Sequence, residues 1–215
     1  MKTITSLQEM EKQIGASSTS GGAKKYFSLK DGESFKIRFR QELTEDSTNF
    51  DSEAGTAMTT NVVTSVINWK WKVASTAQSE QHGYRCWGTE QATSNGRWKP
   101  RPHLLINVAV EVEPGNWEPR VVDTTFNQRH IGLTLIEYAK EFGTITDRYY
   151  KYARTGSGAS DTNYTLIPLE IADEPEAVTA LALHDLNGMY MSLPYSEQET
   201  YLTTGERASA PASDW

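Results

Sequence analysis

Aromatic residues alternate with basic residues in three segments of this 215-residue chain, and a fourth segment carries a row of bases. Cations neutralise phosphates, and flat rings stack on unpaired bases at about 1–3 kcal/mol per base. These residue types together favour binding of a single-stranded nucleic acid. The phosphate candidates are Lys36, Arg38, Arg40, Lys70, Lys72, Arg97, Lys99, Arg101, Arg148, Lys151 and Arg154, and the stacking candidates are Trp69, Trp71, Trp98, Tyr149, Tyr150 and Tyr152.

Each of these clusters also has a purely structural interpretation. Trp and Tyr are common in cores, and Lys beside Trp on a strand can be plain alternation. In residues 148–154, Arg148, Tyr150, Tyr152 and Arg154 would share one face of a strand, while Tyr149 and Lys151 share the other. Because alternation sends some candidates inward, we expect about half of them to contact a ligand.

Motifs for catalysis or metal binding are not found in the sequence. The spacings of a phosphate loop, a nucleophile elbow and a zinc-protease helix do not occur. His82 and Cys86 are four residues apart and could form half a metal site, but a structural zinc site needs four ligands. A single cysteine excludes an intramolecular disulfide framework. We therefore expect no enzyme, no metal and no cofactor.

The charge is unevenly distributed along the chain. The net charge is −7, yet residues 1–169 carry +1 and residues 170–215 carry −8. Such asymmetry suggests an acidic interaction tail, and the competing interpretation is a solubilising end. The longest apolar run, 104–112, is too short to span a bilayer, and the N-terminus lacks the apolar stretch of a signal peptide. We expect a chain that does not associate with membranes and resides in a reducing cytoplasm.

Hydrophobic periodicity predicts a mainly β chain. In residues 34–40, Phe35, Ile37 and Phe39 alternate with three bases, as in a half-buried strand. Further strands are predicted over 61–72, 103–112, 120–126, 144–152 and 164–169, and helices over 4–14, 130–142 and 173–186, with a Gly/Ser linker at 15–23. Five or six strands with one helix inserted late indicate a small, partly open β-barrel or an α+β sheet.

Two segments resemble a known family. Residues 26–39 read YFSLKDGESFKIRF, and residues 143–158 read GTITDRYYKYARTGSG, followed at 161–169 by DTNYTLIPL. Both are similar to the core of bacteriophage single-stranded-DNA-binding proteins of the helix-destabilising type. The matches cover roughly residues 26–40 and 140–170. In the second segment, aromatic, basic, Gly and Pro positions all fall in order.

The resemblance implies an OB-fold, a small Greek-key β-barrel, with one inserted helix. It also implies sequence-independent coating of single-stranded DNA during phage DNA replication, recombination and repair in the host cell cytoplasm. An acidic C-terminal tail would contact phage replication and recombination proteins, here through Asp214 and Trp215, and would compete with DNA for the basic cleft. The N-terminal helix would mediate self-association along the strand. Some members bind zinc, but Cys86 is accompanied by Thr89 where a second cysteine could stand, so a lost or absent metal site is expected.

These observations define a working hypothesis with three parts along the chain. Residues 1–23 form an N-terminal helix and flexible linker, residues 24–170 the DNA-binding core, and residues 171–215 the acidic C-terminal segment. Three alternatives remain open. The protein could anneal complementary strands in recombination, it could be a structural virion β-domain indifferent to DNA, or it could be a nuclease or other enzyme, which the missing motifs disfavour.

Overall fold

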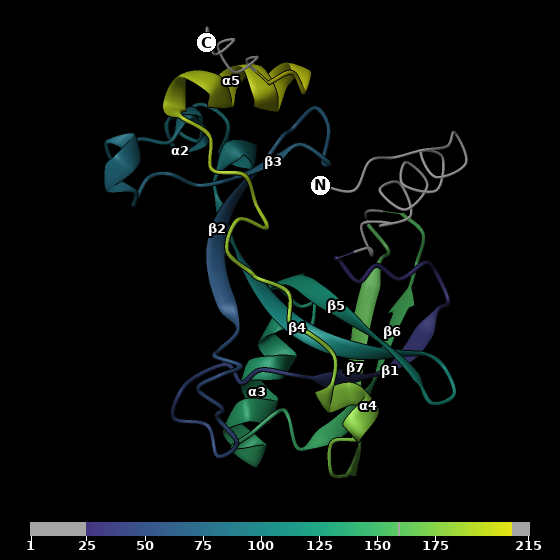
Figure 1. Cartoon of the computed structure of the whole chain (residues 1–215). Helices are drawn as coiled ribbons and strands as arrows, with labels where there is room; N and C mark the ends of the chain where they lie inside the picture. Colours follow the sequence, from purple (N-terminus) through teal and green to yellow (C-terminus); the bar gives the residue numbers. More distant parts are fainter. Residues whose placement is uncertain (1–24, 159, 208–215) are drawn as a thin grey trace, which may run out of the picture.

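Seven antiparallel strands form one sheet in the computed structural model, which describes residues 25–158 and 160–207 (Figure 1). The chain is therefore mainly β, as predicted. The strands are β1 (Ser34–Phe39), β2 (Met58–Thr64), β3 (Lys72–Ala74), β4 (Arg101–Glu113), β5 (Asn116–Thr125), β6 (Arg148–Thr155) and β7 (Asn163–Ile171). The predicted N-terminal helix and linker, residues 1–23, and the C-terminal pair Asp214 and Trp215 lie outside the described residues.

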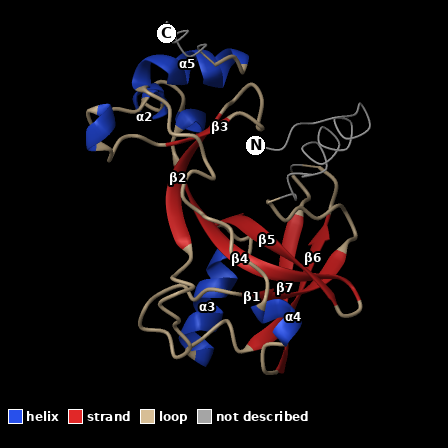
Figure 2. Cartoon of the chain, viewed as in Figure 1, coloured by secondary structure: helices blue, strands red, loops and turns tan. Residues whose placement is uncertain are grey.

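Strand β4 organises the sheet because it pairs with three other strands. Along one edge it forms a hairpin with β5, from His103–Thr125 to Glu113–Asn116. Along the other edge its first half pairs with β2 and its second half with β1. Strands β6 and β7 follow beyond β1. The β2 end of β4 extends away from the other strands and supports a separate group of short helices (Figure 2).

The main core lies on the inner face of β1, β4 and β6. Ile37 and Phe39 are fully buried there, as the alternation of β1 predicts, and Tyr150 of β6 packs edge-on against Phe39. Helix α3 (Gly132–Phe142) closes one end of this core with Leu135. It ends at Gly143, whose φ of +74° is the left-handed conformation that a glycine adopts at low cost.

A small lobe, residues 63–100 with 191–205, has a second apolar core. It contains β3, the 3-10 helices η1 (Glu80–His82) and η2 (Gly96–Trp98), and helices α2 (Trp87–Gln91) and α5 (Tyr195–Thr204). Cys86, Trp87, Trp98 and Leu202 are buried together in it. The buried Gln198 of α5 accepts from the Trp87 backbone N–H and donates to the Leu193 carbonyl. Apolar packing and the hydrogen bonds of the Gln198 amide hold α2 and α5 together.

Residues 172–191, which we call the strap, cross the outer face of the sheet from β7 to the small lobe (Figure 1). The strap includes the one-turn helix α4 (Glu176–Thr179). His184 exchanges hydrogen bonds with Asn107 on β4, and Leu186 and Tyr190 pack on Leu105 and Val121. Much of the acidic segment is thus packed against the sheet.

The structure corrects two predicted elements and adds one that the sequence did not predict. The strand predicted over 61–72 ends at Thr64, because the Ser65 hydroxyl accepts the N–H groups of Ile67 and Asn68 and turns the chain. The helix predicted over 173–186 is only Glu176–Thr179, since the residues after it bind β4 through His184. Helix α5 was not predicted at all.

Candidate nucleic-acid interface

A cleft of about 610 Å³ lies between the β2–β3 loop of the small lobe and one end of the sheet. Aromatic side chains make up much of its lining, together with Lys70 of the loop and Lys72, the first residue of β3. The lining includes Tyr26, Trp69, Lys70, Lys72, His103, Asp123, His130, Tyr152, Tyr164 and Tyr190. The cleft therefore combines flat rings with cations, which is the combination that the sequence pattern predicted.

The β2–β3 loop holds Trp69 out of the protein core. Its side chain is 69 % exposed, the largest exposure among the large apolar side chains of the described residues. The Asn68 side chain accepts the Lys70 N–H and the Asn68 carbonyl accepts the Trp71 N–H, which fixes a tight turn at this point. The Lys70 ammonium lies 5.9 Å from the centroid of the Trp69 ring. An indole in this position contributes little to folding and is available to a ligand.

A polar network forms the floor of the cleft. His103 Nδ1 lies 2.7 Å from Asp123 Oδ1, the Tyr190 hydroxyl donates to Asp123 Oδ2, and the Lys72 ammonium is 4.0 Å from the same oxygen. Burial acts to raise the pKa of Asp123, but the His103 hydrogen bond and charge, with Tyr190 and Lys72, outweigh it and hold that pKa below its usual value. The floor thus carries an ionised carboxylate whose oxygens are engaged by protein groups.

Replacing Asp123 with Asn should make the free energy of unfolding less dependent on pH in the acidic range. Because the folded-state pKa is below the ordinary 3.8, the network stabilises the fold fully above that value and loses this contribution as the pH falls through the folded-state pKa. The D123N variant should be less stable than wild type by about 1–3 kcal/mol at neutral pH. Urea denaturation should show this gap narrowing at about pH 3. If the difference in free energy of unfolding between wild type and D123N stays constant with pH, the stabilising role of the ionised Asp123 is contradicted.

Stacked rings line another wall. The rings of Tyr152 and Tyr164 have centroids 5.8 Å apart, and those of His130 and Tyr164 5.1 Å apart, with interplanar angles of 24° and 28°. The Arg154 guanidinium lies 5.8 Å from the Tyr164 ring and donates to the Leu29 carbonyl. Burial lowers the pKa of His130, so this ring is neutral at physiological pH. The Tyr152 ring is buried, so the half-buried rings of Tyr164 and His130 extend the aromatic surface beyond Trp69.

Tyr26 and Tyr190 connect this aromatic surface to the strap. Their ring centroids are 6.4 Å apart, and the Tyr26 hydroxyl donates to the Met189 carbonyl at 2.7 Å. Burial, together with the Asp123 charge, raises the pKa of Tyr26 to about 12. The phenol is therefore un-ionised at physiological pH and adds no negative charge to the cleft.

The basic row on β1 is engaged by the protein itself. The Lys36 ammonium lies 3.0 Å from Glu170 Oε1 and 3.8 Å from the centroid of Tyr149. Arg38 donates to the Ala172 carbonyl, and Arg40 pairs with Glu174 at 2.7 Å and donates to the Val178 carbonyl. The sequence predicted these three bases as phosphate contacts, but in this structure β7 and the strap occupy them.

Several aromatic candidates serve the cores instead. Trp98 packs edge-on against Trp87, Tyr149 stacks on Trp117, and Tyr150 is fully buried. Trp71 packs against Gly205 at the end of α5, so closely that a Cβ on Gly205 would lie 2.5 Å from the indole. These four residues therefore lie outside the candidate interface. Of the predicted stacking residues, Trp69 and Tyr152 line the cleft, but Tyr152 is buried in the main core and Trp69 is the exposed one.

The other predicted bases are divided among several places. Arg148 pairs with Asp147 and lies over the Phe142 ring, away from the cleft lining. Lys151 is exposed on β6, and Arg97, Lys99 and Arg101 are exposed around the turn between η2 and β4. Lys70 and Lys72 line the cleft, whereas Arg154 is outside its lining and donates to the carbonyls of Leu29 and Gly156.

The prediction from sequence missed Tyr26, His130, Tyr164 and Tyr190. Tyr26 precedes the first strand and Tyr190 lies in the strap, where no periodic pattern marks them. Tyr26 and Tyr164 fall within the segments that resemble the phage family, which is the one signal that could have selected them.

Neither a metal centre nor a membrane span is found among the described residues. No three His, Cys, Asp or Glu side chains within 25–158 and 160–207 are grouped to hold a metal ion. No helix in the same ranges is long and apolar enough to cross a bilayer. Comparison of the chain with protein-family models, with curated proteins and with solved structures finds no match.

Proposed function

We propose that this protein binds single-stranded DNA without regard to sequence, and that the aromatic cleft is the binding site. The observation that carries the proposal is the exposed Trp69, held by a tight turn beside Lys70 at the edge of a cleft with further rings. An exposed indole beside a lysine is the minimum unit for stacking a base and neutralising its phosphate.

The charges in the cleft determine how a strand lies in it. Asp123 on the floor repels phosphates, whereas Lys70 is exposed on the loop. Bases therefore enter the cleft and stack on its rings, while the sugar–phosphate backbone lies along the loop, near Lys70. Contacts to ring faces and phosphates do not read base edges, so binding is independent of sequence.

We propose that β1, β4, β5, β6 and β7 constitute an OB-fold. Helix α3 lies between the third and fourth of these strands, and β1 pairs with both β4 and β6. In OB-folds, strands 2 and 3 and the loops after strands 1 and 4 bind nucleic acid. Here these correspond to β4, β5 and residues 40–100 and 156–162. His103 comes from β4, Asp123 from β5 and Trp69 from the long first loop, which supports placing the site at this cleft.

The biological setting that we propose rests on the resemblance to phage helix-destabilising proteins. The protein would coat and protect single strands during phage replication, recombination and repair, in the host cell cytoplasm. Its partners would be single-stranded DNA, neighbouring copies along the strand, and phage replication or recombination proteins that bind the C-terminal end.

Tryptophan fluorescence during titration with a mixed-sequence oligonucleotide tests the proposal. We expect quenching by the single strand, weak quenching by a duplex of the same sequence, and weaker binding as salt rises, because phosphate contacts release counterions. An absence of any change with single strands at low salt would refute DNA binding and favour a structural virion domain. Acceleration of strand pairing in a parallel assay would identify an annealing protein.

A further inference from the structure

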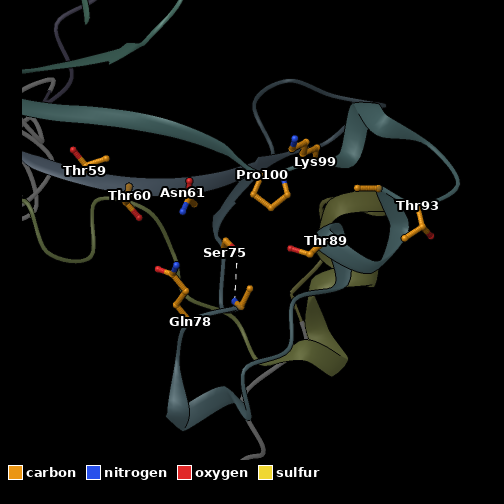
Figure 3. Close-up of a pocket in the computed structure, with 11 residues that line it drawn as sticks. Thr59, Thr60, Asn61, Ser75, Gln78, Thr89, Thr93, Lys99 and Pro100 are labelled. Atoms are coloured by element: carbon orange, nitrogen blue, oxygen red, sulfur yellow. Dashed lines mark hydrogen bonds between the residues drawn. The ribbon is translucent and has the colours of Figure 1, made fainter. Parts of the chain in front are cut away.

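A second cavity, of about 570 Å³, lies on the small lobe outside the aromatic cleft (Figure 3). Strand β2, the segment after β3, helix α2 and the turn before β4 surround it. Its lining is dominated by neutral polar side chains, among them Thr60, Asn61, Gln78 and Thr93, with Lys99 at one side. No aromatic ring lines this cavity, so stacking on bases cannot be its role.

The absence of acidic side chains distinguishes this cavity. None of its eleven lining residues is Asp or Glu. The aromatic cleft includes Asp123, and three further cavities of the described residues include Asp46, Glu53 and Glu42, respectively. In a chain with a net charge of −7, a cavity without a carboxylate is a place where an anion meets little repulsion.

The surroundings add positive charge. Arg97, Lys99 and Arg101 are all exposed within five residues of each other at the turn that borders the cavity. Hydroxyls, amides and an ammonium are the side-chain groups that contact phosphate and sugar oxygens in nucleic-acid complexes. The composition of the cavity therefore suits a phosphodiester and its sugars.

We infer that this cavity binds the sugar–phosphate backbone of the same single strand whose bases enter the aromatic cleft. The inference rests on the proposed function and extends its site. Trp69 and Lys72 lie at the turn of the β2–β3 hairpin, and Asn61 and Ser75 lie at its other end, joined by a backbone hydrogen bond of 2.7 Å. Strand β3 spans only about 10 Å at 3.3 Å per residue. Because side chains alternate along a strand, Lys72 and Ser75 lie on opposite faces of the hairpin, and a nucleic-acid strand that occupies both cavities passes around the β2–β3 turn.

Binding of short and long oligonucleotides tests this inference. Lengths of about 5 and about 15 nucleotides lie near the two ends of the range that one OB-fold covers. Replacing Lys99 with Ala should weaken binding of the long oligonucleotide several-fold more than binding of the short one. It should also reduce the slope of log K against log salt by about 0.7 for the long strand, because one phosphate contact is lost. Thr60→Val, which leaves the charge unchanged, should weaken binding of the long oligonucleotide without changing that slope.

Lys140→Ala on the exposed surface of α3 is the matched control, since it removes the same charge elsewhere. If K99A and K140A bind the long strand equally, the inference is wrong while the proposed function stands. If the wild type binds neither oligonucleotide, the proposed function fails as well. Inorganic phosphate alone, added at constant ionic strength, should not raise the melting temperature; a rise in wild type that K99A abolishes would identify a free-phosphate site and overturn the inference.

Discussion

Trp69→Ala should weaken binding of single-stranded DNA by about tenfold to a hundredfold, the loss expected when one base–aromatic stack is removed. The indole is 69 % exposed, so its removal should leave no cavity and should change the free energy of unfolding little. Fluorescence anisotropy of a labelled oligonucleotide measures the affinity without relying on the deleted indole. Trp69→Phe keeps a flat ring and should retain most of the affinity.

Ile67→Ala is the matched control for this variant. Ile67 lies in the same loop, is 62 % exposed and does not line the cleft. Its truncation tests whether any loss arises from the loop as a whole. Wild-type affinity in W69A, or equal losses in W69A and I67A, would exclude Trp69 as a stacking residue and remove the main support for the proposed site.

Periodicity predicted the elements that bury one face. Strand β1, the β4–β5 hairpin and helix α3 all appear where the alternation or the 3.6-residue spacing indicated, because burial of one face is a local property of the sequence. Helix α5 was missed since its central contact is a polar side chain, Gln198, buried against α2 and the residues before α5. Hydrophobic periodicity assigns polar residues to the surface, so it does not detect a polar residue that is buried.

The candidate site was predictable in residue type but not in position. Trp69-Lys70-Trp71-Lys72 reads as an alternating strand, yet the Ser65 and Asn68 side chains bind the backbone and make a turn, which leaves both Trp69 and Lys70 exposed. The basic row of β1 is occupied by Glu170 and Glu174, which are more than 130 residues away in the sequence. Contacts over such separations depend on the tertiary fold, so no local pattern reveals them.

Glu42→Ala should be among the most destabilising substitutions outside the apolar cores. Glu42 is 1 % exposed, and its carboxylate accepts hydrogen bonds from the backbone N–H groups of Ile145 and Thr146 and from the hydroxyls of Thr144 and Thr146. These bonds tie the end of β1 to the turn between α3 and β6. Each buried donor left without an acceptor costs roughly 1–3 kcal/mol, so we expect a loss of about 3 kcal/mol or more. Urea denaturation measures it.

Two companion variants separate the hydrogen bonds from other effects. Glu42→Gln keeps one carbonyl oxygen in place and should lose less stability than Glu42→Ala, because part of the donor set remains satisfied. Glu45→Ala removes an exposed carboxylate from the same loop and should have little effect. Because Glu42 does not line the aromatic cleft, the folded E42A protein should still bind single strands, measured well below its melting temperature. Equal stability of E42A and E45A would show that this carboxylate does not hold the turn to β1.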